Sequence, residues 1–212
     1  MLISELDTPA LVVDLDVMQQ NLSRMAEYCR AHNLRLRPHT KTHKIPELAR
    51  MQIESGASGI TVAKLSEAEV MLDAGLNDLL IAYPIVGPTK ATRLATLAER
   101  ATLTVSLDSA EAARGISTAM SERGTSAGIL VELDAGFGRC GVPNESEALK
   151  LAQTVFSLPG LTFEGLMFFP GHFGVAPDER TVLRKQVNEL LDRCLETFAR
   201  AAMPLRTISG GS

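Results

Sequence analysis

The sequence contains few cysteines and no excess of positive charge. Its three cysteines, Cys29, Cys140 and Cys194, are odd in number and far apart, which argues against a disulfide framework and against a CxxC metal site. The formal net charge is −4, so the chain has no sequence-wide basic surface with which to neutralise the phosphates of a nucleic acid. We therefore expect reduced thiols and no nucleic-acid partner.

Long hydrophobic runs are also absent. No apolar stretch approaches the roughly 20 residues of a membrane-spanning helix, and residues 1–15 carry acids where a signal peptide carries lysine or arginine. We expect no membrane partner and a cytoplasmic location. Apolar side chains make up 45% of the 212 residues, enough for one sizeable core, and no linker or low-complexity segment interrupts them. The chain is predicted to be one domain over 1–212.

The order of apolar segments predicts repeated βα units. Short β-branched runs alternate with longer stretches of helical period, as expected around a parallel sheet. Strands are predicted at 10–15, 34–40, 59–63, 78–83, 102–107, 128–134, 161–168 and 205–209, and helices at 16–32, 44–55, 66–75, 88–99, 109–123, 144–156 and 178–202. Helix starts are predicted at Asp16, at Asp108 or Ser109, and at the pairs Ser66 with Glu69 and Asn144 with Glu147. Periodicity leaves open whether the sheet closes into a barrel.

Two of the predicted strands carry charge on one face. Side chains alternate along a strand, so Arg37, His39 and Lys41 share a face, and Glu132 and Asp134 share another. Buried charges are costly unless they are paired. We therefore expect a polar barrel lumen in which Arg37 and His39 face Glu132 and Asp134, near the carboxyl ends of the strands. The alternative is a solvated face of an edge strand.

The densest group of reactive side chains is RPHTKTHK at 37–44, with two of the four histidines and two lysines at the end of a predicted strand. A lysine amine in such a place can attack a carbonyl carbon. Structural ion networks produce similar clusters, so charge pattern alone leaves a functional lysine open. The simpler interpretation has Lys44 solvated at a helix start and His43 capping or packing.

Two glycine-containing segments follow predicted strands. DAGFGRCG at 134–141 lets the backbone approach a ligand and offers Arg139 as a fixed cation. Cys140 is expected to be a packed neighbour rather than a nucleophile, since no base is recognisable nearby. Residues Ser209, Gly210, Gly211 and Ser212 end the chain and can present backbone N–H groups to a phosphate. A Gly-Gly pair alone is a weak signal, because it is usually a simple turn.

Recurring motifs identify a family. RPHTKTHK resembles the RPHxKTHK signature of D-threonine aldolases, D-serine dehydratases and related hydroxyaspartate aldolases. The similarity continues in order through TPALVVDLDVMQQN, TVAKLSEAE, LLIAYP, VELDAGFGRCGV and ISGGS, and so spans almost the whole chain. It implies an α/β fold of the (β/α)8 TIM-barrel type, like the N-terminal domain of alanine racemase, with pyridoxal 5′-phosphate held as a Schiff base on Lys41. It also implies a homodimer and retro-aldol cleavage of a β-hydroxy-D-amino acid to glycine and an aldehyde.

The resemblance assigns further roles. Arg139 is expected at the phenolic oxygen of the cofactor, and the four residues from Ser209 to Ser212 at its phosphate. We count His39 and His172 with Lys41 as candidate catalytic residues, although a lone loop histidine such as His172 is more often a surface residue. Phe169 stands where relatives commonly have tyrosine, which leaves the substrate open.

The same relatives continue into a β domain that carries a pair of ligands, His-x-Cys or His-x-Asp, for a divalent metal (Mn, Zn or Mg). This chain ends in the phosphate loop, so we expect a barrel that is incomplete at its last strand, with 10–15 belonging to the β domain. No metal ligand set is expected here, because His39 and His43 straddle a strand end. The alternatives to an aldolase are a D-serine dehydratase, an amino-acid racemase, a non-catalytic cofactor carrier and an inactive remnant.

Overall fold

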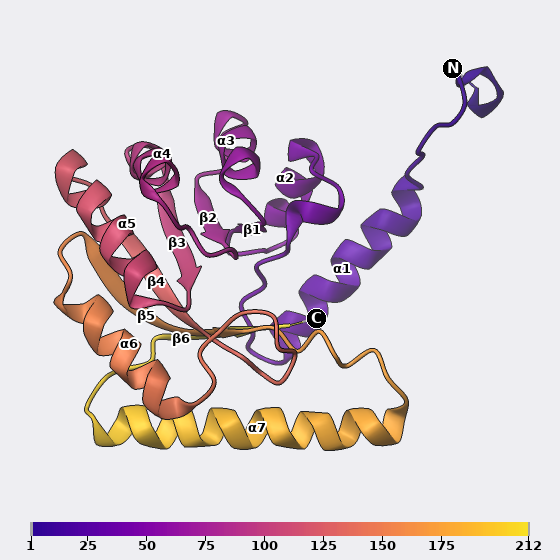
Figure 1. Cartoon of the computed structure of the whole chain (residues 1–212). Helices are drawn as coiled ribbons and strands as arrows, with labels where there is room; N and C mark the ends of the chain where they lie inside the picture. Colours follow the sequence, from indigo (N-terminus) through magenta and orange to yellow (C-terminus); the bar gives the residue numbers. More distant parts are fainter. Residues whose placement is uncertain (1, 212) are drawn as a thin grey trace.

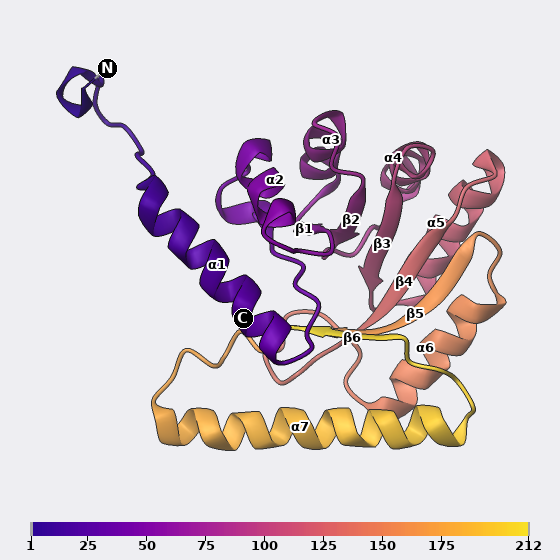
Figure 2. The same cartoon turned by 180° about the vertical axis from the view of Figure 1, so that it is seen from behind.

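The computed structural model describes residues 2–211 and contains one parallel sheet. Its six strands lie side by side in chain order, and Figures 1 and 2 show the sheet curling, with helices around its outer side. The strands are β1 (Ile60–Val62), β2 (Asp78–Ile81), β3 (Thr102–Leu107), β4 (Ala127–Leu133), β5 (Leu161–Phe168) and β6 (Thr207–Gly210). The predicted α/β fold of repeated βα units is confirmed, as a curled half-barrel.

Helices alternate with these strands in the predicted order. They are α1 (Leu15–Ala31), α2 (Pro46–Glu54), α3 (Leu65–Asp73), α4 (Pro88–Ala98), α5 (Ala110–Arg123), α6 (Glu145–Ser157) and α7 (Pro177–Arg200), with short 3-10 turns η1 (Ile3–Glu5) and η2 (Thr40–Thr42). No helix in residues 2–211 is long and apolar enough to cross a membrane.

Helix starts agree with the sequence in two cases and differ in two. Ser109 accepts from the Ala112 backbone N–H, and Asn144 caps α6, as predicted. Asp14 rather than Asp16 caps α1, because that helix begins at Leu15. The predicted capping pair of Ser66 with Glu69 is wrong. The helix α3 begins one residue before Ser66, and the Glu69 carboxylate instead pairs with Arg93.

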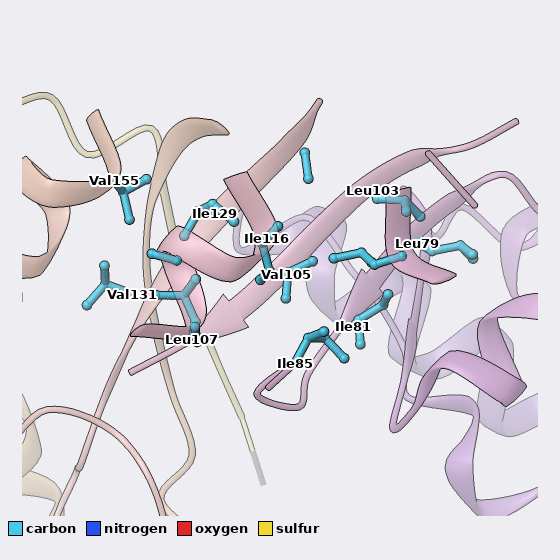
Figure 3. Packing of buried hydrophobic residues seen from close by; sticks show 14 of the residues in the cluster. Leu79, Ile81, Ile85, Leu103, Val105, Leu107, Ile116, Ile129, Val131 and Val155 are labelled. Atoms are coloured by element: carbon cyan, nitrogen blue, oxygen red, sulfur yellow. The ribbon is translucent and has the colours of Figure 1, made fainter. Parts of the chain in front are cut away.

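The main core fills the space between the sheet and its helices. Val105 of β3 and Ile129 of β4 are fully buried and point towards α5, where Ile116 is also fully buried (Figure 3). Buried apolar side chains recur at every second residue of β2, β3 and β4, so this face of the sheet is apolar and packed. The opposite, concave face of the sheet is left for polar side chains and for the site.

Two predicted strands are not part of this sheet. Residues 10–14 have no regular structure and Leu11 is 96% exposed, on an arm that leaves the body of the protein (Figure 1). The apolar run indicated strand propensity, but a strand also needs a neighbour to pair with, and no strand among residues 2–211 pairs with this arm. The prediction of a strand at 10–15 is therefore wrong.

The segment 34–40 is extended but forms only one isolated bridge, between His39 and Thr61. The backbone N–H groups of Ser58 and Thr61 donate to the carbonyl oxygens of Leu36 and Pro38 at 2.8 and 2.7 Å. Pro38 has no N–H to return, so a regular ladder does not form. The segment nevertheless lies along β1 as the expected strand would, and it carries Lys41 to the concave side.

The sheet does not close within the described residues. Arg35 reaches across from the 34–40 segment and donates a 3.3 Å hydrogen bond to the Thr207 hydroxyl at the start of β6. No strand of residues 2–211 lies between these two edges. This arrangement agrees with the predicted barrel that is incomplete at its last strand.

Candidate active site

The concave face of the sheet encloses an open cavity of about 1980 Å³. Most of the site residues predicted from the sequence line it: His39, Lys41, Arg139, Ser209, Gly210 and Gly211. Ser212 lies outside the described residues. His172 does not line this cavity. The fold therefore gathers three distant segments, 39–41, 139–140 and 209–211, around one space.

Lys41 lies on a turn that is anchored on both sides. Thr40 is fully buried, and its hydroxyl donates to the carbonyl oxygen of Thr61 at 3.1 Å. The Lys41 backbone N–H donates to Nδ1 of His39 at 3.3 Å. These contacts fix the backbone of Lys41, while its exposed side chain is left free to extend over the cavity.

A buried carboxylate supports the same turn. Glu67 accepts a 2.8 Å hydrogen bond from the Ala63 backbone N–H, and its other oxygen lies 3.9 Å from Nζ of Lys44. It thereby joins the turn to the start of α3. Burial lowers the pKa of His39, and the charge of Lys41 adds to this, while Glu67 and a backbone hydrogen bond at Thr61 oppose it. The neutral form that burial favours suits the acceptor role of Nδ1.

The expected ionic lumen does not form as predicted. Arg37 pairs with Asp78 of β2 at 2.9 Å rather than with Glu132 or Asp134. Asp134 accepts from the backbone N–H groups of two loop glycines, each at 3.0 Å. The prediction was wrong because the 34–40 segment lies beside β1 and β2, so the nearest carboxylate to Arg37 is at the start of β2.

Arg139 lies on a loop that glycines make possible. Gly141 has φ +110°, and a Cβ there would overlap with the backbone nitrogen of Asp134. Its N–H donates to the Asp108 carboxylate at 3.0 Å. Because the loop folds back this closely, Arg139 reaches the cavity instead of solvent beyond the strand end.

One aromatic ring brings the two cations together. The guanidinium carbon of Arg139 lies 4.4 Å from the ring centroid of Phe169, and Nζ of Lys41 lies 5.7 Å from the same centroid. A ring face attracts both cations. From the sequence, Phe169 is noted only as a departure from relatives. Its position directly after β5 is the signal that could have indicated its contact with the two cations.

Of the remaining predicted residues, His172 lies away from the cavity and the glycines at the end of β6 line it. His172 stacks on Phe137, with ring centroids 6.3 Å apart, and lies against Gly136. It supports the Arg139 loop rather than facing the cavity. At the end of β6, a Cβ on Gly210 would overlap with the ring of Phe168, whereas the space around Gly211 is open. Backbone groups there are accessible to a ligand.

Cys140 is expected to be a slow nucleophile. Burial raises its pKa, and its hydrogen bond to Glu132 acts in the same direction, while Arg139 opposes them. Iodoacetamide should therefore label Cys140 appreciably only at a pH above the usual thiol range, as followed by mass spectrometry. Cys29 and Cys194 are buried in helices and should react only on unfolding. Rapid labelling of Cys140 at neutral pH would contradict this prediction.

Comparisons with known proteins agree with the fold. The chain is 37% identical to a D-threonine aldolase of Arthrobacter sp. over 99% of its length and 56% of the relative's. It is 40% identical to a D-threo-3-hydroxyaspartate dehydratase of Delftia sp. over 98% of its length and 55% of the relative's. The chain thus spans about half the length of the curated relatives it matches.

A solved structure has the same fold. The crystal structure of D-threonine aldolase from Filomicrobium marinum matches with a TM-score of 0.95 and 38% identity, over 98% of this chain and 57% of the other. The model of the alanine racemase N-terminal domain matches residues 13–212, nearly the whole sequence. The chain therefore belongs to the alanine racemase N-terminal domain family.

Proposed function

We propose that this cavity binds pyridoxal 5′-phosphate through Lys41 and serves a lyase that cleaves β-hydroxy-D-amino acids. The observation that carries the proposal is the meeting of Lys41 and Arg139 at one ring, in the cavity that the end of β6 also lines. The similarity to a D-threonine aldolase and to a hydroxyaspartate dehydratase supports the reaction class.

The groups present fit this cofactor. A primary amine suits its aldehyde, a permanent cation suits its phenolic oxygen, and accessible backbone N–H groups suit its phosphate. Lys41, Arg139 and the residues Ser209 to Gly211 supply these three kinds of group from separate segments. Since the cavity is lined by all of them, one ligand can meet the whole set.

The bound cofactor supplies an electron sink for cleavage of bonds at the α-carbon of an amino acid. In our proposal, Lys41 would hold the cofactor through its aldehyde carbon, and Arg139 would stabilise the negative charge on its phenolic oxygen. His39, neutral and bonded to the Lys41 backbone, orients the lysine turn rather than acting on substrate. His172 acts only by supporting the Arg139 loop.

Residues 2–211 contain no group of three or more His, Cys, Asp or Glu side chains that could hold a metal ion. The divalent metal that the resemblance implies for intact enzymes does not fit these residues. We therefore assign no metal-dependent step to this chain. The predicted homodimer and the cytoplasmic location stay predictions.

The proposal is tested by adding pyridoxal 5′-phosphate to the purified chain and recording the visible absorbance band of lysine-bound cofactor. Borohydride reduction and peptide mass spectrometry then identify the modified residue. We expect a band and a single modified peptide containing Lys41. A folded chain that gives neither band nor modified peptide would overturn the proposal.

The dehydratase is a second candidate, favoured by the 40% identity to the Delftia enzyme. Products separate the two reactions, with D-threonine and 3-hydroxy-D-aspartate as substrates and Mn²⁺ added. An aldolase releases glycine and an aldehyde, whereas a dehydratase releases ammonia and a keto acid without glycine. Interconversion of D- and L-alanine would instead indicate a racemase, and cofactor binding without turnover would indicate a carrier.

A further inference from the structure

A buried carboxylate lies behind the cavity and has no part in the proposed chemistry. Glu132 of β4 is 2% exposed, and within the described residues no ion pair involves it. Its two oxygens accept hydrogen bonds from neutral donors, the Ser106 hydroxyl at 2.5 Å and the Cys140 thiol at 3.0 Å. Burying a carboxylate is unfavourable unless it is hydrogen bonded, so both contacts matter.

Cys140 connects this carboxylate to the site. The side chain of Cys140 lines the cavity, whereas Glu132 does not, so the thiol lies between the carboxylate and the space for the ligand. Cys140 directly follows Arg139 in the chain. Glu132 raises the pKa of the thiol, and Arg139 opposes this.

The loop around Arg139 is held at both ends by backbone hydrogen bonds, which at its far end run between Val142 and the strand residues Glu132 and Asp134. Its amides at Gly136 and Gly138 bond to Asp134, and the amide of Gly141 bonds to Asp108. Gly138 and Gly141 flank the two residues between them, with φ of +69° and +110°. Glycines allow many backbone conformations. Between these two glycines, the Cys140 thiol is bonded to the strand residue Glu132, directly next to an exposed Arg139.

We infer that Glu132 is a positioning residue which, through Cys140, holds Arg139 against Phe169 and beside Lys41. Ser106 completes the arrangement by occupying the second carboxylate oxygen. The inference rests on the proposed function, because it concerns how Arg139 meets the phenolic oxygen of the cofactor. Loss of Glu132 should leave the position of Lys41 unchanged and alter the position of the Arg139 side chain.

The test compares the wild-type chain with the variants Glu132→Gln, Cys140→Ala and Cys140→Ser. Glutamine has only one oxygen acceptor, so Glu132→Gln can no longer accept from both donors, and alanine removes the thiol donor. We expect both variants to raise the Kd for pyridoxal 5′-phosphate about tenfold. At one fixed pH, they should also change the ratio of the two absorbance bands of the lysine-bound cofactor. Serine keeps a donor, so Cys140→Ser should stay near the wild type.

The matched control is Ser117→Ala. Ser117 is also buried, on α5 outside the sheet, and its hydroxyl donates to the Pro159 carbonyl oxygen at 2.7 Å. Its loss should lower stability and leave the Kd and the band ratio unchanged. If Glu132→Gln does not fold, the two Cys140 variants carry the test, because each changes a single contact.

The outcomes separate the two proposals. A wild-type chain without bound cofactor would refute the proposed function, and the inference with it. A wild-type chain that binds cofactor, with Cys140→Ala indistinguishable from Ser117→Ala in Kd and band ratio, would overturn the inference alone. A change in Cys140→Ala that serine restores would support it, since a merely structural role would not alter the spectrum.

Discussion

Replacing Lys41 by alanine is expected to abolish borohydride-stable attachment of pyridoxal 5′-phosphate, from one cofactor per chain to none detectable. The reason is chemical, because only an amine forms a reducible link with an aldehyde. The anchored turn of Thr40 should survive the change, since its contacts involve the Thr40 hydroxyl and backbone groups. Folding should therefore be intact, and residual reversible binding through Arg139 would appear as weak binding without the visible band.

The control for this experiment is Lys90→Ala. Lys90 lines the same cavity, and its Nζ lies 5.4 Å from the ring centroid of Tyr83, much as that of Lys41 lies near Phe169. Loss of Lys90 should leave both attachment and spectrum unchanged. Attachment that persists in Lys41→Ala and disappears in Lys90→Ala would assign the cofactor to the other lysine.

Local sequence pattern predicted the repeated unit well because each strand and helix carries its own signal. The strands β3 and β5 have the predicted bounds, since apolar runs end where turn residues begin. The segments 10–15, an apolar run, and 34–40, in which leucine alternates with arginine, are also predicted strands and yet form no ladder strand. Whether such a run pairs depends on a neighbour distant in sequence, and in the second case on Pro38, which removes a donor.

The sequence identified only part of the site, for a related reason. Lys41, Arg139 and Ser209 to Gly211 belong to contiguous motifs, so the sequence identified them, and the structure places them around one cavity. The contacts of Glu132 depend on β3 lying beside β4 and on a loop returning over the strand end. The alternation of side chains along β3 and β4 was an available signal, because it puts Ser106 and Glu132 on the concave side. It does not indicate which groups meet there.

Replacing Gly165 by alanine is expected to lower the free energy of unfolding by about 3 kcal/mol, from backbone strain together with overpacking. Gly165 has φ +143° and pairs with Thr207 of β6. It follows a β-bulge, because Ile129 faces Phe163 and Leu130 faces Gly165, leaving Glu164 as the extra residue. A Cβ at 165 would overlap with the carbonyl oxygen of Thr207. The variant must therefore displace β6 or break its pairing.

The displacement of β6 also connects this position to function. Ser209 and Gly210 lie on β6, so Gly165→Ala should weaken cofactor binding although Gly165 is remote from Lys41 in sequence. Urea unfolding, monitored by circular dichroism, measures the loss of stability, and cofactor titration measures the weaker binding.

Gly115→Ala is the matched control. Gly115 lies exposed on α5 with no atom within 4 Å of an added Cβ, so alanine should stabilise the chain by about 0.5–1 kcal/mol. Equal effects of the two substitutions would mean that the close approach of β5 and β6 is not what Gly165 provides.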